Sequence, residues 1–124
     1  MRYLIGLLFF LSILTAQVTD KNFKDKLGSG FAIVVFTSEW QEKDLNPDIL
    51  KGVRGHEDTQ IYEVKSDKLK KVCKKLRIRN FPSIALFHDG SKKEVWKADM
   101  GGEIDVTAKD IKSAIDGVLA EDVF

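Results

Sequence analysis

The sequence is poor in cysteine and in net charge, and each shortage excludes a class of protein. Its 124 residues contain one cysteine, Cys73, so no internal disulfide can form and the fold does not depend on oxidation. The formal net charge is only +1, which argues against nucleic acid as a partner. With 44% hydrophobic and 31% charged residues, the composition is that of one ordinary globular domain. A chain of this size can bury a core without metal or disulfide support.

Ligand sets for metals are lacking as well. The two histidines, His56 and His88, lie far apart in the sequence, and neither has cysteines or carboxylates at ligand spacing around it. We therefore expect no metal, no cofactor and no small-molecule substrate. Cys73 lies between Val72 and Leu76 on the apolar stripe of a predicted helix, which indicates a buried core residue. The alternative for this thiol is single-cysteine exchange.

The first 17 residues differ from the rest of the chain. Arg2 supplies a positive start, and the segment from Tyr3 to Ala16 then carries no charge. This pattern is typical of a signal peptide, and it is short for a membrane-spanning helix, which needs about 17–25 residues. Two interpretations stay open: a cleaved leader, or a retained apolar helix that contacts a membrane or a partner protein. We therefore divide the chain into a hydrophobic leader, 1–17, and a globular domain, 18–124.

Hydrophobic periodicity predicts alternating helices and strands in the globular domain. The predicted strands are 31–37, 59–64, 83–87 and 93–100. The predicted helices are 18–27, a brief one opened by Asn46-Pro47, 66–77, and a last one opened by Thr107 and Asp110 as a capping box. The dipeptide Asp89-Gly90 predicts a hairpin turn between the last two strands. The alternation indicates parallel pairing, with the hairpin adding an antiparallel pair, in an α/β fold with a central mixed sheet flanked by helices.

Two segments about forty residues apart carry a family resemblance. The run Phe36-Thr37-Ser38-Glu39-Trp40 ends an apolar strand, and Asn80-Phe81-Pro82-Ser83 opens another. Together with the order of elements, they resemble the thioredoxin family, including domains of the protein disulfide isomerase type. The resemblance covers about residues 18–120. It implies a thioredoxin-like fold and a cis peptide bond before Pro82.

The resemblance also shows what is missing. The family carries Cys-x-x-Cys after the tryptophan, and this chain carries Gln41-Glu42-Lys43-Asp44. Gln41 matches the nucleophilic thiol, Asp44 the resolving thiol, and Val35 a carboxylate that relays protons. None of these side chains can do thiol–disulfide chemistry, so we expect no enzyme of the usual redox kind. The helix after the motif is expected to be shortened.

These features predict a redox-inactive structural or interaction module, with no catalytic residues. One version is an accessory subunit of a membrane-associated complex. The alternative is a luminal peptide-binding protein, similar to non-catalytic relatives of protein disulfide isomerase. The expected location is a membrane or the lumen of the secretory pathway, with a mitochondrial membrane as the alternative.

The candidate partner-binding residues fall into two groups. Trp40, Phe81 and Pro82 lie beside the degenerate motif, and Lys70, Lys71 and Lys74 belong to a basic stretch, 65–79, with eight cations and one acid. A purely structural role stays open for each: a loop, a turn and a solvated helix face. For the lysines, the functional alternative is docking on an acidic partner or on anionic lipid headgroups.

Overall fold

The computed structural model describes residues 18–41 and 43–123. The hydrophobic leader, 1–17, lies outside the described residues, so the apolar helix expected there stays a prediction. None of the helices within the described residues reaches the length and hydrophobicity needed to cross a bilayer.

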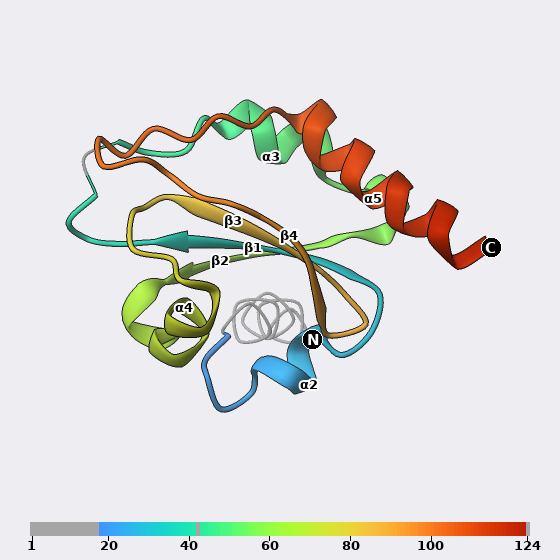
Figure 1. The fold of residues 1–124 in the computed structure, drawn as a ribbon, viewed down its shortest axis with the longest axis horizontal. Helices are drawn as coiled ribbons and strands as arrows, with labels where there is room; N and C mark the ends of the chain where they lie inside the picture. The colour runs from blue at the N-terminus through green and yellow to red at the C-terminus, as the bar shows by residue number, and fades with distance from the viewer. Residues whose placement is uncertain (1–17, 42, 124) are drawn as a thin grey trace, which may run out of the picture.

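A four-stranded mixed sheet forms the centre of the fold, and it confirms the predicted class (Figure 1). The strands, in the order β2-β1-β3-β4 across the sheet, are β2 (Gln60–Lys65), β1 (Phe31–Thr37), β3 (Ser83–His88) and β4 (Ser91–Trp96). Strands β1 and β2 are parallel, whereas β3 is antiparallel to both β1 and β4. Parallel pairing was therefore predicted correctly for β2 and wrongly for β3.

The connection between β2 and β3 accounts for this reversal. It contains the seven-residue helix α4 (Lys70–Leu76), and it leaves and re-enters the sheet at the same end. Ser83 pairs with Phe36, near the end of β1 where β2 also finishes. Strand β3 therefore runs back along β1 in the opposite direction.

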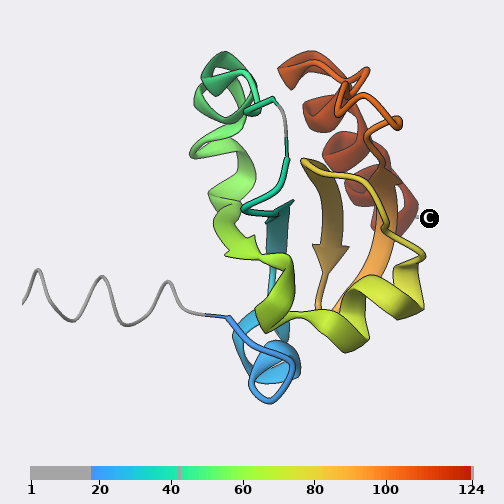
Figure 2. The same ribbon diagram turned by 90° about the vertical axis from the view of Figure 1, so that its left-hand side faces the viewer.

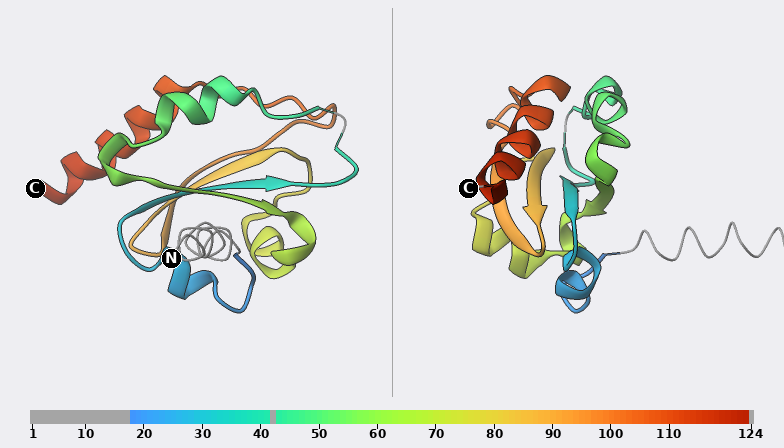
Figure 3. Two further views of the ribbon diagram at one scale, coloured as in Figure 1. Left: turned by 180° about the vertical axis from the view of Figure 1, so that it is seen from behind. Right: turned by 90° about the vertical axis from the view of Figure 1, so that its right-hand side faces the viewer.

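Two layers of helices cover the two faces of the sheet (Figures 2 and 3). Helix α2 (Phe23–Leu27) and helix α4 lie over one face, and α3 (Pro47–Val53) and α5 (Ala108–Val123) lie over the other. Two short 3₁₀ turns, η1 (His56–Asp58) and η2 (Ser66–Lys68), precede β2 and α4.

Strand β1 separates two hydrophobic clusters. Its side chains alternate between the faces because successive residues of a strand point in opposite directions. Ala32, Val34 and Phe36 enter the cluster beneath α2 and α4. Phe31, Ile33 and Val35 enter the cluster beneath α3 and α5. Burial on both faces is what the continuous apolar run predicts.

Local signals fixed several element boundaries. The Asn46 side chain accepts a hydrogen bond from the Asp48 N–H at 2.9 Å, and Pro47 is the first helical residue of α3. Thr107 and Asp110 exchange two hydrogen bonds at the start of α5, which confirms the capping box. Asp89 and Gly90 both have positive φ, as the hairpin turn requires.

Two predicted helices begin later than expected. Helix α2 starts only at Phe23, because the Asn22 side chain accepts a hydrogen bond from the Thr19 N–H and holds a turn there. The first residues of the predicted helix 66–77 form η2, and Leu69, with φ −128° and ψ 42°, separates that turn from α4.

Candidate functional site

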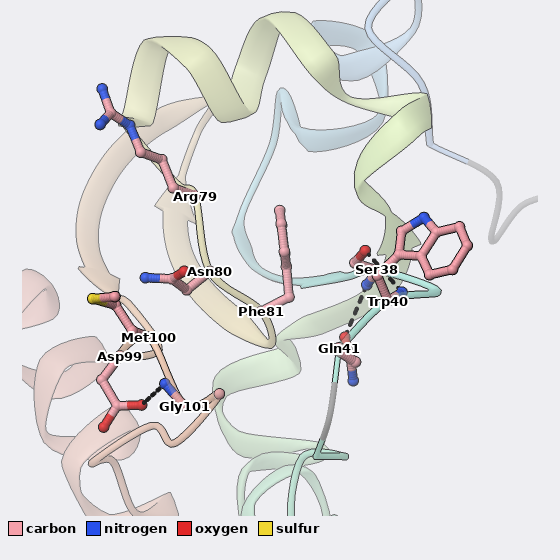
Figure 4. Close-up of a pocket in the computed structure, with 10 residues that line it drawn as sticks. Ser38, Trp40, Gln41, Arg79, Asn80, Phe81, Asp99, Met100 and Gly101 are labelled. Carbon is pink, nitrogen blue, oxygen red and sulfur yellow. Dashed lines mark hydrogen bonds between the residues drawn. The ribbon is translucent and has the colours of Figure 1, made fainter.

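The loop that the resemblance aligns with the thiol motif follows β1 and is held by its own polar groups (Figure 4). The Gln41 side chain accepts a hydrogen bond from the Ser38 N–H at 2.8 Å and donates one to the Lys43 carbonyl at 3.0 Å. The Trp40 N–H donates to the Ser38 hydroxyl at 3.2 Å. Gln41 therefore stabilises the loop, because its amide oxygen and its amide nitrogen both form hydrogen bonds within it. Glu42 lies outside the described residues.

No helix begins at this loop within the described residues. The following helix, α3, begins at Pro47, six positions beyond Gln41, and Asp44 is exposed in the extended segment between them. A reactive thiol needs the N–H groups and dipole of a helix start to lower its pKa. Position 41 lacks that environment in addition to lacking the thiol.

Val35 lies wholly inside the core. Its side chain is 0% exposed and packs in the cluster beneath α3 and α5. An ionised group at this depth would have to be paired or hydrated. Val35, which has no ionisable group, therefore fits its apolar surroundings.

The second loop of the candidate site precedes β3. The Phe81–Pro82 peptide bond is cis, as the resemblance implied, and Pro82 is buried. The Ser83 hydroxyl donates to the Asn80 carbonyl at 2.8 Å and accepts from the Ala98 N–H at 3.0 Å. Phe81 packs against the cluster beneath α4. The loop is therefore anchored to the sheet and, through Ala98, to the segment that follows β4.

A hollow of about 270 Å³ lies between these two loops and a third one, 99–102. In Figure 4, Phe81 stands in the middle, the Trp40 ring points away to one side, and Met100 lies on the other side. Trp40 is 89% exposed and Met100 is 95% exposed, the two large apolar side chains on the described surface with such exposure. A smaller hollow of about 170 Å³ lies on the other flank of Trp40, against residues 65–67. We call the surface that contains both hollows the Trp40 groove.

The third loop was not predicted. The strand expected over 93–100 ends at Trp96, and the Asp99 carboxylate accepts hydrogen bonds from the N–H groups of Gly101 and Glu103 and shapes a turn beyond it. Lys43 and Glu103 form an exposed ion pair between the first loop and this one, and such a pair contributes little to stability. Gly102 has φ +81°, and its Cα approaches the Phe81 carbonyl closely enough that a Cβ would lie 3.3 Å from that oxygen. Only an Asx-type turn signal at Asp99 could have indicated this loop.

A family model described as thioredoxin matches residues 14–116, which is most of the sequence. The chain belongs to the thioredoxin family. Among characterised relatives, Thioredoxin AMT13 of Alternaria alternata is 34% identical over 85 residues, which cover 65% of this chain and 71% of that protein. The thioredoxin fold is therefore shown by the sequence as well as by the structure.

Solved structures agree on the fold. A designed protein superposes with a TM-score of 0.62 at 13% identity, covering 83% of this chain and 94% of that one. The first two thioredoxin domains of Saccharomyces cerevisiae Eps1p give a TM-score of 0.56 at 19% identity, covering 79% of this chain and 38% of that chain. The corresponding Naumovozyma dairenensis structure gives 0.53 at 22% identity, covering 66% and 34%. The chain thus spans about a third of each Eps1p structure, and at these identities the likeness concerns the fold alone.

The single thiol of this thioredoxin-family chain lies away from the Trp40 groove. Cys73 is 7% exposed and belongs to the cluster beneath α2 and α4, which confirms the core prediction. Burial, with a further contribution from the negative charge of Asp20, raises the pKa of the Cys73 thiol from 9.0 to about 11. Both low exposure and a high pKa oppose thiolate chemistry.

Labelling with a maleimide tests this assignment. At pH 7, a pKa raised by about two units lowers the thiolate fraction about a hundredfold. We expect native Cys73 to react at least about a hundredfold more slowly than an exposed thiol, and denaturant to abolish the difference. The control is Ser113→Cys in a Cys73→Ala background, because Ser113 is exposed on α5. Equal rates for the two thiols in the native state would contradict the assignment.

A cluster around His56 was not visible in the sequence. The ligand atoms of His56, Glu57 and Asp116 all lie within 4.8 Å of one another. Sequence spacing could not show this, because Asp116 reaches His56 from α5, 60 residues away. The His56 Nε2 and Asp116 Oδ1 atoms form a hydrogen bond of 2.9 Å, and Glu57 follows His56 directly in the chain, which together account for the proximity. We assign no metal site to the cluster.

Of the three lysines predicted to bind a partner, only one lines a groove. Lys70, Lys71 and Lys74 are all exposed on α4. Lys71 borders a second groove together with Lys75, whereas Lys70 and Lys74 do not line it. The basic stretch 65–79 thus predicted an exposed basic face, but it did not indicate the groove beside that face.

Proposed function

We propose that this thioredoxin-family chain is a redox-inactive interaction module that binds an extended segment of a protein partner at the Trp40 groove. The observation that carries the proposal is the pairing of two features at one place. The positions of both catalytic thiols hold Gln41 and Asp44, and the surface beside them exposes Trp40 and Met100. The fold and its groove are retained where the redox groups are not.

The lack of redox chemistry is supported by three separate features. Gln41 is hydrogen-bonded within its loop, the nearest described helix begins six positions later, and Val35 offers no proton relay. Cys73, the only cysteine, is buried and its pKa is raised. The name of the Alternaria relative favours a redox role, so thiol exchange through Cys73 is the alternative to be tested.

The binding role is supported by the exposed apolar side chains. Tryptophan and methionine are enriched at interfaces because they bury a large apolar area on contact. Trp40 stands between two hollows, so a partner segment could contact both faces of its ring. The Phe81 and 99–102 loops flank the groove and are fixed by hydrogen bonds, which limits the entropy lost on binding.

The cellular setting of the module is part of the same proposal. With a retained leader, the chain would be an accessory subunit of a membrane-associated complex, in the secretory pathway or at a mitochondrial membrane. With a cleaved leader, it would be a luminal protein that binds extended peptides without catalysis. N-terminal sequencing of the native protein separates the two, because only a cleaved chain starts near residue 18.

The test uses S-alkylated insulin B chain as an extended probe without free thiols. We expect a fluorescent probe to bind the native chain and Trp40→Ala to weaken binding by about thirtyfold or more, because truncation of an anchor aromatic costs about 2 kcal/mol or more. Lys51→Ala, an exposed change on α3, should leave binding unaltered. Fluorescence anisotropy gives the three dissociation constants.

A parallel assay tests redox inactivity. In dithiothreitol-driven reduction of intact insulin, we expect the native chain to add nothing to the uncatalysed rate, and Cys73→Ala to behave identically. Catalysis that disappears in Cys73→Ala would establish the alternative. A native chain that does not bind the alkylated probe, or a Trp40→Ala variant that binds it equally well, would contradict the binding role.

A further inference from the structure

A second groove lies beside α4 and is larger than the hollow beside Trp40. It has a volume of about 460 Å³ and lies between α2, α4 and the β3–β4 turn. Its apolar lining comes from Phe23, Val72, Leu76 and Phe87. The rings of Phe23 and Phe87 meet edge to face with their centroids 5.1 Å apart, so part of the lining is fixed by packing. We call this surface the lysine groove.

Cations surround this apolar lining. The ammonium-bearing residues are Lys24, Lys71, Lys75 and Lys92, and all four are exposed. Within the described part of the chain, none of them forms an ion pair with a carboxylate. They come from three separate elements, so the arrangement is produced by the fold and could not be recognised in the basic stretch 65–79 alone.

One acid, Asp20, also borders the groove, but its oxygens are engaged. They accept hydrogen bonds from the N–H groups of Lys71 and Val72, at 3.1 and 3.3 Å. Asp20 thereby caps α4, whose own N-cap residue, Leu69, has no capping side chain. The groove therefore presents four cations against one carboxylate that already serves the helix start.

The described part of the chain begins beside this groove. Val18, the first described residue, is buried in the cluster beneath α2 and α4, and Asp20 follows two positions later on the groove rim. The last leader residue is thus within about 10 Å of chain length from the rim. A leader held in a bilayer would bring this face of the domain to the membrane surface.

We propose that the lysine groove binds the headgroup region of an anionic phospholipid at that surface. The four ammonium groups complement the phosphate and carboxylate oxygens of the lipid, and the apolar lining covers the glycerol and first acyl carbons. This inference rests on the retained leader of the proposed function, and it is independent of peptide binding and of redox inactivity.

The test measures partitioning of the full-length chain onto vesicles. The vesicles contain phosphatidylcholine alone or with 30 mol% phosphatidylserine. Each lysine held at an anionic surface changes the partition coefficient about fivefold. We expect Lys71→Gln/Lys75→Gln to lower partitioning onto the anionic vesicles by about thirtyfold. Because the leader is common to both chains, its contribution cancels in this ratio.

A matched variant carries the same loss of charge on the other face. Lys51 lies on α3 and Lys109 on α5, and both are exposed. We expect Lys51→Gln/Lys109→Gln to change partitioning by less than about threefold. Equal losses for the two double variants would show a general charge effect and would overturn the lysine groove as the site.

Lysine acetylation read by peptide mass spectrometry gives a second measure. On anionic vesicles, Lys71, Lys75 and Lys92 should be protected several-fold relative to Lys51 and Lys109, and 0.5 M salt should remove the protection. No selective protection would overturn the proposal, as would a native chain that fails to bind neutral vesicles through its leader. Binding to polyglutamate that depends on Lys71 and Lys75, without any effect on vesicles, would assign the groove to an acidic protein instead. The insulin assays contain no lipid, so their failure would leave these outcomes intact.

Discussion

Val35→Asp should destabilise the domain by about 5 kcal/mol or more at pH 7, which approaches the whole free energy of unfolding of a small domain. The substitution places a carboxyl group at the position that the family resemblance assigns to a proton relay. Val35 is 0% exposed on the central strand, and its neighbours in the cluster are apolar, among them Ile49, Val53 and Ile84. The variant therefore loses apolar burial and leaves a polar group without partners.

The loss should depend on pH, and its sign follows from burial. Desolvation raises the pKa of the new carboxyl group in the folded state above the value of about 3.9 that it has in the unfolded chain. The unfolded state therefore releases its proton first. The penalty should be smallest below about pH 4, where both states are protonated, and should grow as the pH rises towards 7.

Urea denaturation followed by circular dichroism at several pH values measures this effect. Val35→Thr is the control, because it introduces a polar group of similar size that cannot ionise at these pH values. We expect it to cost about 1–2 kcal/mol with no dependence on pH. A Val35→Asp variant as stable as the native chain at pH 7 would show that the cluster admits water or a partner for the carboxylate.

Local signals predicted the parts of the fold that depend on neighbouring residues. The apolar run 31–37 became β1 with the same bounds, and Asn46, Thr107 and Asp89 each made the capping or turn interaction that their residue types favour. The direction of β3 could not be predicted in this way. It depends on the end of the sheet at which the chain re-enters after α4, and the pairing of Ser83 with Phe36, 47 positions away, sets that end.

The same distinction applies to the candidate site. The resemblance assigns Gln41, Asp44 and Val35 to the positions of the redox groups because each has a fixed place relative to Trp40 in the sequence, and this assignment stays a prediction. The Trp40 groove could be recognised only once the fold was known. Met100 reaches it from a loop about sixty positions beyond Trp40, and the lysine groove joins Lys24 and Lys92 to α4 from separate elements. Long-range contacts of this kind leave no periodic pattern in a single sequence.

Gly52→Ala should destabilise the domain by about 1–3 kcal/mol, although the same change normally stabilises a helix by about 1 kcal/mol. Gly52 lies in α3 where that helix crosses the start of α5. A Cβ at position 52 would lie 2.4 Å from the Cβ of Ala108, whereas carbon atoms in contact are about 3.5–4.0 Å apart. The two helices would have to separate, which would loosen their packing over the cluster that contains Val53 and Ile111.

A double-mutant cycle isolates this contact. Ala108→Gly removes the opposing methyl group, so Gly52→Ala/Ala108→Gly should recover most of the lost stability, with a coupling energy of about 1–3 kcal/mol. Gly117→Ala is the matched control, because a Cβ there meets nothing within 4 Å on α5, and it should stabilise the domain by about 0.5–1 kcal/mol. Thermal and urea unfolding of the four variants give the required free energies. Additive effects at positions 52 and 108 would show that α3 and α5 are not in contact there, and the layer that covers Val35 would then be less tightly packed than the first prediction requires.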